Sequence, residues 1–219
     1  MLITKNMIKI YYNDNEIVVC EKPYGVSSQK SGGENMVDML REQLLCDIFP
    51  VHRLDTTTTG LIVFAKNEKS SATLSLDIAS RRFEKKYLAV CHGILKEKGK
   101  IESLLFHDRL KNKSFVVDTK RKGAKEAILE YTPLGFNAER ELTLLKIKLL
   151  TGRTHQIRVQ LSSRGNPLYG DGKYGARDNA KIALHSHVLE LFHPITREKM
   201  CFKSLPKGEI WELFKEISV

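Results

Sequence analysis

The alternation of hydrophobic and polar residues predicts a chain made mainly of short strands. Residues 8–25 hold two apolar, β-branched stretches around an Asn-Asp-Asn turn, and Pro23 and Gly25 end the second stretch. Five further segments have the composition of strands: residues 61–67, 85–95, 127–136, 140–150 and 181–191. The third and fourth of these are expected to pair in antiparallel fashion across the polar turn that joins them.

Apolar residues at helical spacing predict four helices. They lie in residues 34–46, 69–83, 151–165 and 207–217. Ser70 is expected to cap the second helix, and Thr151 and Gly165 are expected to begin and end the third. Because strands dominate and the helices are interspersed irregularly, the pattern predicts an α+β fold rather than a doubly wound sheet.

No repeat, low-complexity segment or Pro/Gly/Ser-rich linker divides the chain. Residues 1–219 are therefore expected to form a single catalytic domain. Lysines and arginines are concentrated in residues 100–125, which predicts a basic loop or hairpin, either solvated or in contact with RNA.

Charge narrows the range of partners. The 219 residues contain 36 Lys and Arg against 26 Asp and Glu, a net charge of +10, and the calculated pI is 9.4. At this size, such an excess favours a polyanionic partner, either nucleic acid or a phosphorylated substrate.

Cysteine spacing and hydropathy indicate the compartment. Four cysteines lie far apart with no C-x-x-C pair, which excludes a zinc ribbon and favours reduced thiols. The first ten residues contain no signal-peptide core, and no apolar run approaches the roughly 20 residues of a membrane helix. A soluble, cytoplasmic protein is expected.

His185 and His187 share one strand face, but no further ligands accompany them, so no metal site is predicted.

Residues 51–67, VHRLDTTTTGLIVFAKN, place a carboxylate directly before a predicted buried strand. Asp55 is ionised at neutral pH and can act as a covalent nucleophile, or it can simply bracket the threonine-rich turn. In extended chain Arg53 points the same way as Asp55, as a substrate-binding cation or a surface ion-pair residue. His52 points the opposite way, which favours a structural hydrogen bond over a role in binding.

Three residues farther along the chain offer matching chemistry. Tyr87, at the start of a predicted strand, can stack on a planar base and relay a proton, or belong to the core. Arg153 is a candidate partner for a charge-assisted pair with Asp55. Arg158 can bind a phosphate or form a surface salt bridge. No P-loop or G-x-S-x-G motif is present.

Taken together, these segments resemble the RluA-type pseudouridine synthases. The resemblance covers most of the chain and rests on five segments: EKPYGV, HRLDTTTTGLIVFAK, KKYLAVCHG, LLTGRTHQIRVQLSSRGNPLYGDGKYG and ALHSHVLELFHP. Of these, HRLD followed by T-x-G is highly specific, and TGRTHQIR supports it independently. The family usually has T-S-G where this chain has Thr58-Thr59-Gly60.

The resemblance implies an isomerase that converts uridine in RNA, either rRNA or tRNA, into pseudouridine without metal or organic cofactor. It implies Asp55 as nucleophile, Tyr87 in contact with uracil and Arg153 paired with Asp55. RNA binding would fall to Arg53, which would help to extrude the target nucleotide, and to His52 and Arg158. The implied fold is a mixed, largely antiparallel central sheet with flanking helices and a central catalytic cleft.

Some choices stay open at this point. Attack of Asp55 at C1′, attack at C6 and a glycal route are all compatible with an ionised carboxylate. Many relatives begin with an S4-like RNA-binding module, but the first predicted strand starts near Met7, so none is expected here. RNA capture would then rest on the catalytic domain, acting as a monomer without a required protein partner or membrane.

Two other functions compete with this interpretation. An RNA N-glycosidase would need a second acid to activate water, and Asp77 or Glu84 could supply it. A non-catalytic RNA-binding module would use the same basic surface but would not depend on Asp55.

Overall fold

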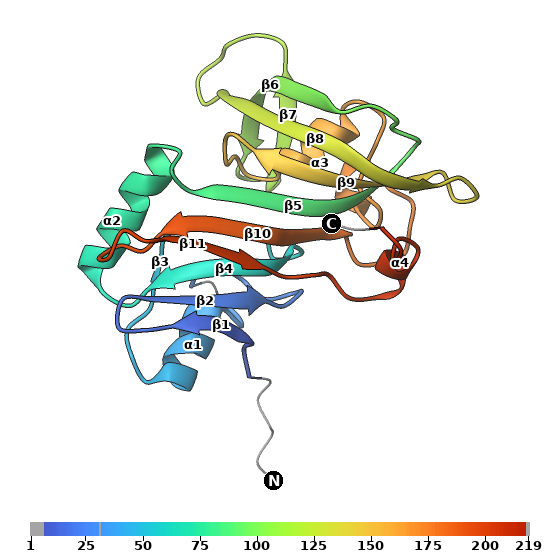
Figure 1. Ribbon diagram of the computed structural model, residues 1–219. Coiled ribbons are helices and arrows are strands. Elements are labelled where there is room, and N and C mark those ends of the chain that lie inside the picture. The colour runs from blue at the N-terminus through green and yellow to red at the C-terminus, as the bar shows by residue number, and fades with distance from the viewer. Residues whose placement is uncertain (1–6, 31, 218–219) are drawn as a thin grey trace. The chain divides into compact units, whose positions relative to one another are not determined.

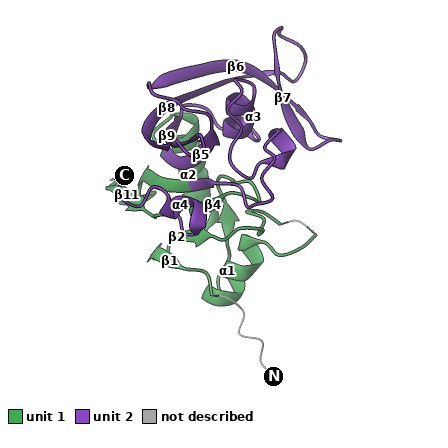
Figure 2. Ribbon diagram, turned by 90° about the vertical axis from the view of Figure 1, so that its right-hand side faces the viewer, with its two compact units in different colours: residues 1–84, 186–205 green, residues 85–185, 206–219 purple. Residues whose placement is uncertain are grey.

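The computed structural model describes residues 7–30 and 32–217 (Figure 1), and they divide into two compact units (Figure 2). Unit 1 comprises Met1–Glu84 and Ser186–Leu205, and unit 2 comprises Lys85–His185 and Pro206–Val219. The first six residues, on which part of the signal-peptide expectation rests, lie outside the described residues.

Unit 1 is built on a sheet in the order β1-β2-β4-β10, with β3 on β4 and β11 on β10. The strands are β1 (Ile10–Asn13), β2 (Ile17–Lys22), β3 (Phe49–Pro50), β4 (Thr59–Ala65), β10 (Leu184–Phe192) and β11 (Lys199–Lys203). The predicted strands around the Asn-Asp-Asn turn are confirmed as β1 and β2, which pair in antiparallel fashion, as do β2 and β4. The short strands β3 and β11 were not predicted.

Two helices belong to unit 1, α1 (Met36–Leu44) and α2 (Glu68–Ala79), both at predicted positions. Asn35 caps α1 by accepting the Asp38 N–H. The expectation that Ser70 caps α2 is wrong, because Asn67 is the cap and accepts the Ser70 N–H at 2.9 Å. Asn67 lies one residue before the helix in extended backbone, which is the geometry that an N-cap needs.

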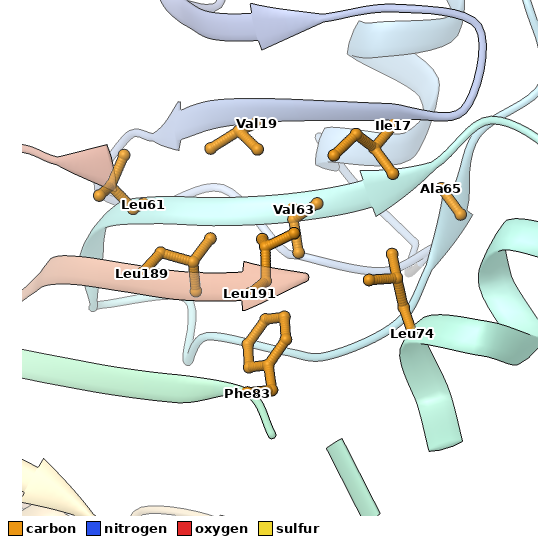
Figure 3. Packing of buried hydrophobic residues seen from close by; sticks show 9 residues of the cluster. All are labelled: Ile17, Val19, Leu61, Val63, Ala65, Leu74, Phe83, Leu189 and Leu191. Carbon is orange, nitrogen blue, oxygen red and sulfur yellow. The ribbon is translucent and has the colours of Figure 1, made fainter. Parts of the chain in front are cut away.

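One part of the core of unit 1 lies between α2 and one face of the sheet. Figure 3 shows nine of its buried residues: Ile17, Val19, Leu61, Val63, Ala65, Leu74, Phe83, Leu189 and Leu191. Alternate residues of β2, β4 and β10 supply most of this cluster, as the period-two geometry of strands requires. The strand β4, which follows the HRLD segment, is therefore fixed by packing along its whole length.

Unit 2 contains a second run of strands in the order β5-β9-β8-β6-β7, and each neighbouring pair is antiparallel. These strands are β5 (Glu84–His92), β6 (Gly99–Asp108), β7 (Lys113–Val117), β8 (Lys125–Asn137) and β9 (Leu142–Leu149). The predicted antiparallel pair is confirmed as β8 and β9, and the basic segment forms the β6–β7 hairpin and the loop to β8.

The helices of unit 2 are short: α3 (Gln156–Ser162), the 3-10 turn η1 (Gly172–Tyr174) and α4 (Glu209–Glu212). Thr151 does not cap α3, because the helix begins five residues later at a His155 cap with φ of 54°. Gly165 lies just beyond the helix with φ of 82°, in the left-handed region expected after a helix end. The α+β class with a largely antiparallel sheet is confirmed, whereas the central cleft and single domain stay predictions.

Candidate active site

The HRLD segment lies in unit 1 as an extended stretch that leads into β4. His52 and Leu54 are buried, whereas Arg53 is exposed and Asp55 is partly exposed. This alternation agrees with the prediction that Arg53 and Asp55 point the same way and His52 the other way. The loop thus presents a cation and a carboxylate together on its accessible side.

Asp55 begins a tight turn. The N–H of Thr58 donates to the Asp55 carbonyl at 2.9 Å, so residues 55–58 form a turn that ends where β4 begins. On the other side, the Ser28 hydroxyl accepts the Leu54 N–H at 2.9 Å and donates to the Leu54 carbonyl at 2.7 Å. The residue before Asp55 is therefore bonded through both its backbone groups to one buried side chain.

Lys22, from the EKPYGV segment, is a buried residue that hydrogen-bonds to the same loop. It is fully buried, and its amine donates to the carbonyls of Pro23 and Val26 at 2.8 Å and of Thr56 at 3.1 Å. Burial lowers the pKa of Lys22 to about 8, and the charge of Asp55 opposes that fall. Lys22 therefore places a buried amine next to the carboxylate that the sequence singles out.

The glycine of the T-x-G pattern has a steric role. Gly60 has φ of 104°, and a Cβ on it would lie only 2.7 Å from the backbone nitrogen of Ser186 in β10. A side chain at this position would therefore push β4 away from β10 directly after the Asp55 turn.

His52 has the structural contacts of a buried histidine. Its Nε2 accepts the Val63 N–H at 3.2 Å, and its ring meets Phe83 edge to face with centroids 5.2 Å apart. These contacts match the structural alternative for His52, and its binding of RNA stays a prediction.

Tyr87 lies in β5 of unit 2 and is buried, opposite Ile147 of β9. Lys85 is two residues earlier and so shares its strand face. A Cβ on Gly152 would lie 3.8 Å from the Lys85 amine, which places that amine against the TGRT segment. Burial lowers the pKa of Lys85 to about 8. Tyr87 thus shares its face with a lysine whose charged form is destabilised by burial.

Gln156 holds the segment that carries Arg153. Its Oε1 accepts the Arg153 N–H at 3.0 Å and the Thr151 hydroxyl at 2.8 Å, and its Nε2 donates to the Ile128 carbonyl at 3.0 Å. The Arg153 side chain is exposed, and its Nε donates to the Glu126 carbonyl at 2.8 Å. One buried amide therefore fixes the backbone from which Arg153 projects.

Arg158 makes a buried ion pair. Its guanidinium binds both carboxylate oxygens of Asp171, with Nε to Oδ2 at 2.7 Å and Nη2 to Oδ1 at 2.8 Å. Both side chains are buried, so the surface salt bridge considered for Arg158 is instead an internal one. This geometry favours a role in holding α3 to the YGDGKYG loop over phosphate binding.

Asp55, Arg53 and His52 lie in unit 1, whereas Tyr87, Arg153 and Arg158 lie in unit 2. The predicted meeting of Asp55 with Tyr87 and Arg153 therefore stays a prediction. Three supporting residues escaped the sequence analysis: Lys22, Ser28 and Gln156. Lys22 and Gln156 stand inside the recognised EKPYGV and TGRTHQIR segments, so their place in those motifs was the available signal.

Within the described part of the chain, no three His, Cys, Asp or Glu residues gather as metal ligands would. His187 instead donates from Nδ1 to the Ser204 carbonyl at 2.6 Å. Among the residues that the structure places, no helix has both the length and the apolarity to span a membrane.

Comparison with known families identifies one match. Residues 16–163 match the family described as RNA pseudouridylate synthase. An RNA pseudouridine synthase of Bacillus subtilis is 33% identical over 87% of this chain, which spans 66% of that protein's length. The tRNA pseudouridine synthase C of Haemophilus ducreyi is 29% identical over 95% of both chains. The ribosomal large subunit pseudouridine synthase D of Pseudomonas aeruginosa is 34% identical over 94% of this chain and 71% of its own.

Solved structures support the fold. The human RNA pseudouridylate synthase domain containing 1 superposes with a TM-score of 0.77 at 24% identity, covering 91% of this chain and 83% of its own. The human domain containing 4 gives a TM-score of 0.76, also at 24% identity, with coverage of 91% and 89%. The predicted similarity to pseudouridine synthase domains is thereby confirmed at the level of the fold.

Proposed function

This chain belongs to the RNA pseudouridylate synthase family, and from that premise we propose that it converts uridines of tRNA, rRNA or both into pseudouridine with Asp55 as the nucleophile. RNA pseudouridine synthases are isomerases. The N1–C1′ bond of uridine breaks, the base turns, and C5 joins C1′, so the RNA neither gains nor loses atoms.

The observation that carries the assignment of Asp55 is the way its loop is held. The carboxylate is partly exposed, while the backbone on either side is fixed by the Ser28 hydroxyl, the Lys22 amine and the turn to Thr58. A nucleophile on a fixed support loses little freedom when it attacks, which is a large part of what an enzyme supplies. An ionised carboxylate needs neither a metal nor an organic cofactor for this attack.

The other residues take roles that follow from their chemistry. We assign Arg53, exposed beside Asp55, to extruding the target nucleotide, which costs a few kcal/mol that stacking and phosphate contacts offset. Tyr87 contacts the uracil and removes the C5 proton, and Arg153 pairs with Asp55. The proposal includes a monomer that acts in the cytoplasm, motivated by the separated cysteines and the absence of a coiled-coil pattern in the sequence.

The relatives suggest which RNA is modified. The tRNA pseudouridine synthase C of Haemophilus ducreyi matches over 95% of its length, and the large-subunit synthase D of Pseudomonas aeruginosa over 71%. Mapping pseudouridine in total RNA from cells with and without this gene tests both. Sites that vanish in tRNA or rRNA identify the substrate, and an unchanged map in both would contradict the proposal.

The glycosidase alternative loses one of its two candidate acids. Asp77 is buried, and its carboxylate binds Arg197 at 2.9 and 3.0 Å and Arg82 at 2.8 Å. Pairing with Arg197 lowers its pKa, so it is a poor base for activating water. Mass measurement separates the two reactions, because isomerisation leaves the RNA mass unchanged and hydrolysis releases uracil.

A further inference from the structure

The turn of the β6–β7 hairpin carries an unusual leucine. Leu110 is fully exposed, and its chain neighbours are Arg109 and Lys111. Single exposed apolar residues are common on protein surfaces and need no explanation by themselves. What sets Leu110 apart is the combination of a fixed turn, an anchored hairpin and a dense local charge.

The turn is held in one conformation by its own polar groups. One carboxylate oxygen of Asp108 accepts the backbone N–H groups of Leu110 and Lys111, both at 3.0 Å. Asn112 adopts φ of 44°, and its carbonyl accepts the Lys173 amine at 3.1 Å. The backbone that carries Leu110 is therefore held by a built turn, so it loses little conformational entropy when a partner packs on the exposed leucine.

The base of the hairpin is tied to the segment that carries Arg153. The Ser114 N–H donates to the Tyr174 hydroxyl at 2.8 Å, and the Ser114 hydroxyl donates to the Thr154 carbonyl at 2.7 Å. Nδ1 of His155 lies 2.9 Å from the same Tyr174 hydroxyl. Within unit 2, the hairpin and the TGRTHQIR segment thus form one bonded assembly, and RNA held by the first is held at a fixed place relative to the second.

Charge around the hairpin is concentrated. Residues 108–125 hold seven lysines and arginines against two aspartates, a net +5, which is half of the whole chain's +10. The cations are Arg109, Lys111, Lys113, Lys120, Arg121, Lys122 and Lys125. Arg121 also lies over the Phe106 ring, 4.0 Å from its centroid, so part of this charge has a fixed position. Such a concentration of positive charge favours a polyanionic partner.

We propose that the β6–β7 turn is an RNA-docking tip, in which Leu110 packs against an exposed base or sugar of the folded RNA while Arg109, Lys111 and Lys113 bind the adjacent phosphates. This rests on the proposed function, because it names how the RNA around the target uridine is held. Apolar wedges flanked by cations are a known way for proteins to bind nucleic acid, and single-stranded loops and bulges present the unstacked bases that such a wedge needs.

The test compares Leu110→Ser with Leu45→Ser, a matched control at a leucine that is 89% exposed with no lysine or arginine within three residues on either side. Affinity for a pool of unmodified tRNA and for a large-subunit rRNA transcript is measured for each variant, together with apparent kcat and KM for pseudouridine formation. Leu110→Ser should weaken binding and raise KM about five- to tenfold with kcat within about twofold, and Leu110→Met should restore both.

The salt dependence of binding separates the contribution of the apolar contact from that of the phosphate contacts. Leu110→Ser should leave the slope of log affinity against log salt unchanged, whereas Lys111→Gln should lower that slope by about 0.7 to 0.9. Wild-type affinity in Leu110→Ser, or an equal loss in Leu45→Ser, would overturn the proposal. RNA affinity is measured separately from pseudouridine formation. Unchanged affinity in Leu110→Ser would contradict the docking tip alone, whereas a wild-type protein that binds RNA but forms no pseudouridine would contradict the proposed function.

Discussion

At the scale of single residues, the chemistry around Asp55 depends on a buried amine. Lys22 has three carbonyl acceptors and no exposed surface, and Asp55 is the nearby charge that favours its protonated form. Burying an ammonium costs free energy unless it is hydrogen-bonded and paired with an opposite charge. Burial therefore shifts the protonation equilibrium of the Lys22 amine toward its neutral form. The gain is a rigid support behind a carboxylate that has to stay partly exposed.

This equilibrium predicts a pH dependence. The pKa of Lys22 falls from 10.5 to about 8 in the folded protein, so between these values the unfolded chain binds the extra proton. The free energy of unfolding should therefore rise with pH from about 8 to 10.5, as a burial penalty of about 3 kcal/mol is relieved. Lys22→Met lacks this titration, and urea unfolding at pH 7 and at pH 10 should show wild type gaining relative to it.

The control for this titration is Lys30→Met, which changes an exposed lysine. Its pH profile should follow wild type. If the free energy of unfolding changed with pH in Lys22→Met as it does in wild type, the Lys22 amine would not titrate in this range.

At the scale of elements, the Asp55 loop is held by few but buried hydrogen bonds. Ser28 lies 26 residues before Leu54 and satisfies both of its backbone groups. Ser28→Ala leaves a buried N–H and C=O without this partner, which costs about 1–3 kcal/mol of stability. We expect kcat to fall by about tenfold while RNA affinity changes little, because the nucleophile is loosened and the binding surface is untouched.

Ser27→Ala is the matched control, since the Ser27 hydroxyl bonds at an exposed position to Gln29, donating to its carbonyl at 2.9 Å and accepting its N–H at 3.4 Å. Urea unfolding and single-turnover kinetics measure both variants. If Ser27→Ala and Ser28→Ala lowered kcat alike, the bridge to Leu54 would not be what positions Asp55.

Sequence pattern predicted these elements better than their ends. The strand β4 was predictable because its apolar run is continuous, and α1 because its apolar residues recur at helical spacing. The cap of α2 was misplaced because Asn67 and Ser70 are both good caps, and only the fold decides which residue takes extended backbone. The strand β11 was missed because Lys199 and Lys203 are exposed and only pairing with β10 makes it a strand.

In the candidate site, too, the sequence predicted some features and missed those that depend on tertiary contacts. The family motifs singled out Asp55, Arg53, Tyr87 and Arg153. The salt bridge considered for Arg158 exists, but it is buried and not at the surface, and its partner Asp171 lies 13 residues away in a separate loop. Ser28 left no sequence signal, since a serine in a polar loop resembles any other. Contacts between residues far apart along the chain are the part that pattern alone does not supply.

At the scale of the whole molecule, charge determines how RNA is captured. The chain carries a net +10, and half of it falls in residues 108–125. Six phosphate contacts would lose about a thousandfold in affinity between 50 and 200 mM salt. We expect tRNA binding by the wild-type protein to show this dependence, measured by titration at a series of salt concentrations.

Replacing Lys120, Arg121 and Lys122 together by glutamine should lower the slope of log affinity against log salt by about 2 to 3. Glutamine at three lysines outside the hairpin, Lys9, Lys30 and Lys66, is the comparison. Affinity that stays flat with salt in the wild-type protein would mean that phosphates do not dominate capture.

The most direct test of the central claim is pseudouridine formation by Asp55→Asn, with Asp47→Asn, at an exposed ion-pair aspartate, as control. Both are incubated with RNA from cells lacking the gene, and the nucleosides are separated and counted while RNA affinity is measured in parallel. We predict that Asp55→Asn loses at least about a thousandfold in turnover while binding RNA within about threefold of wild type, and that Asp47→Asn behaves as wild type. Pseudouridine produced by Asp55→Asn at the wild-type rate would contradict the account.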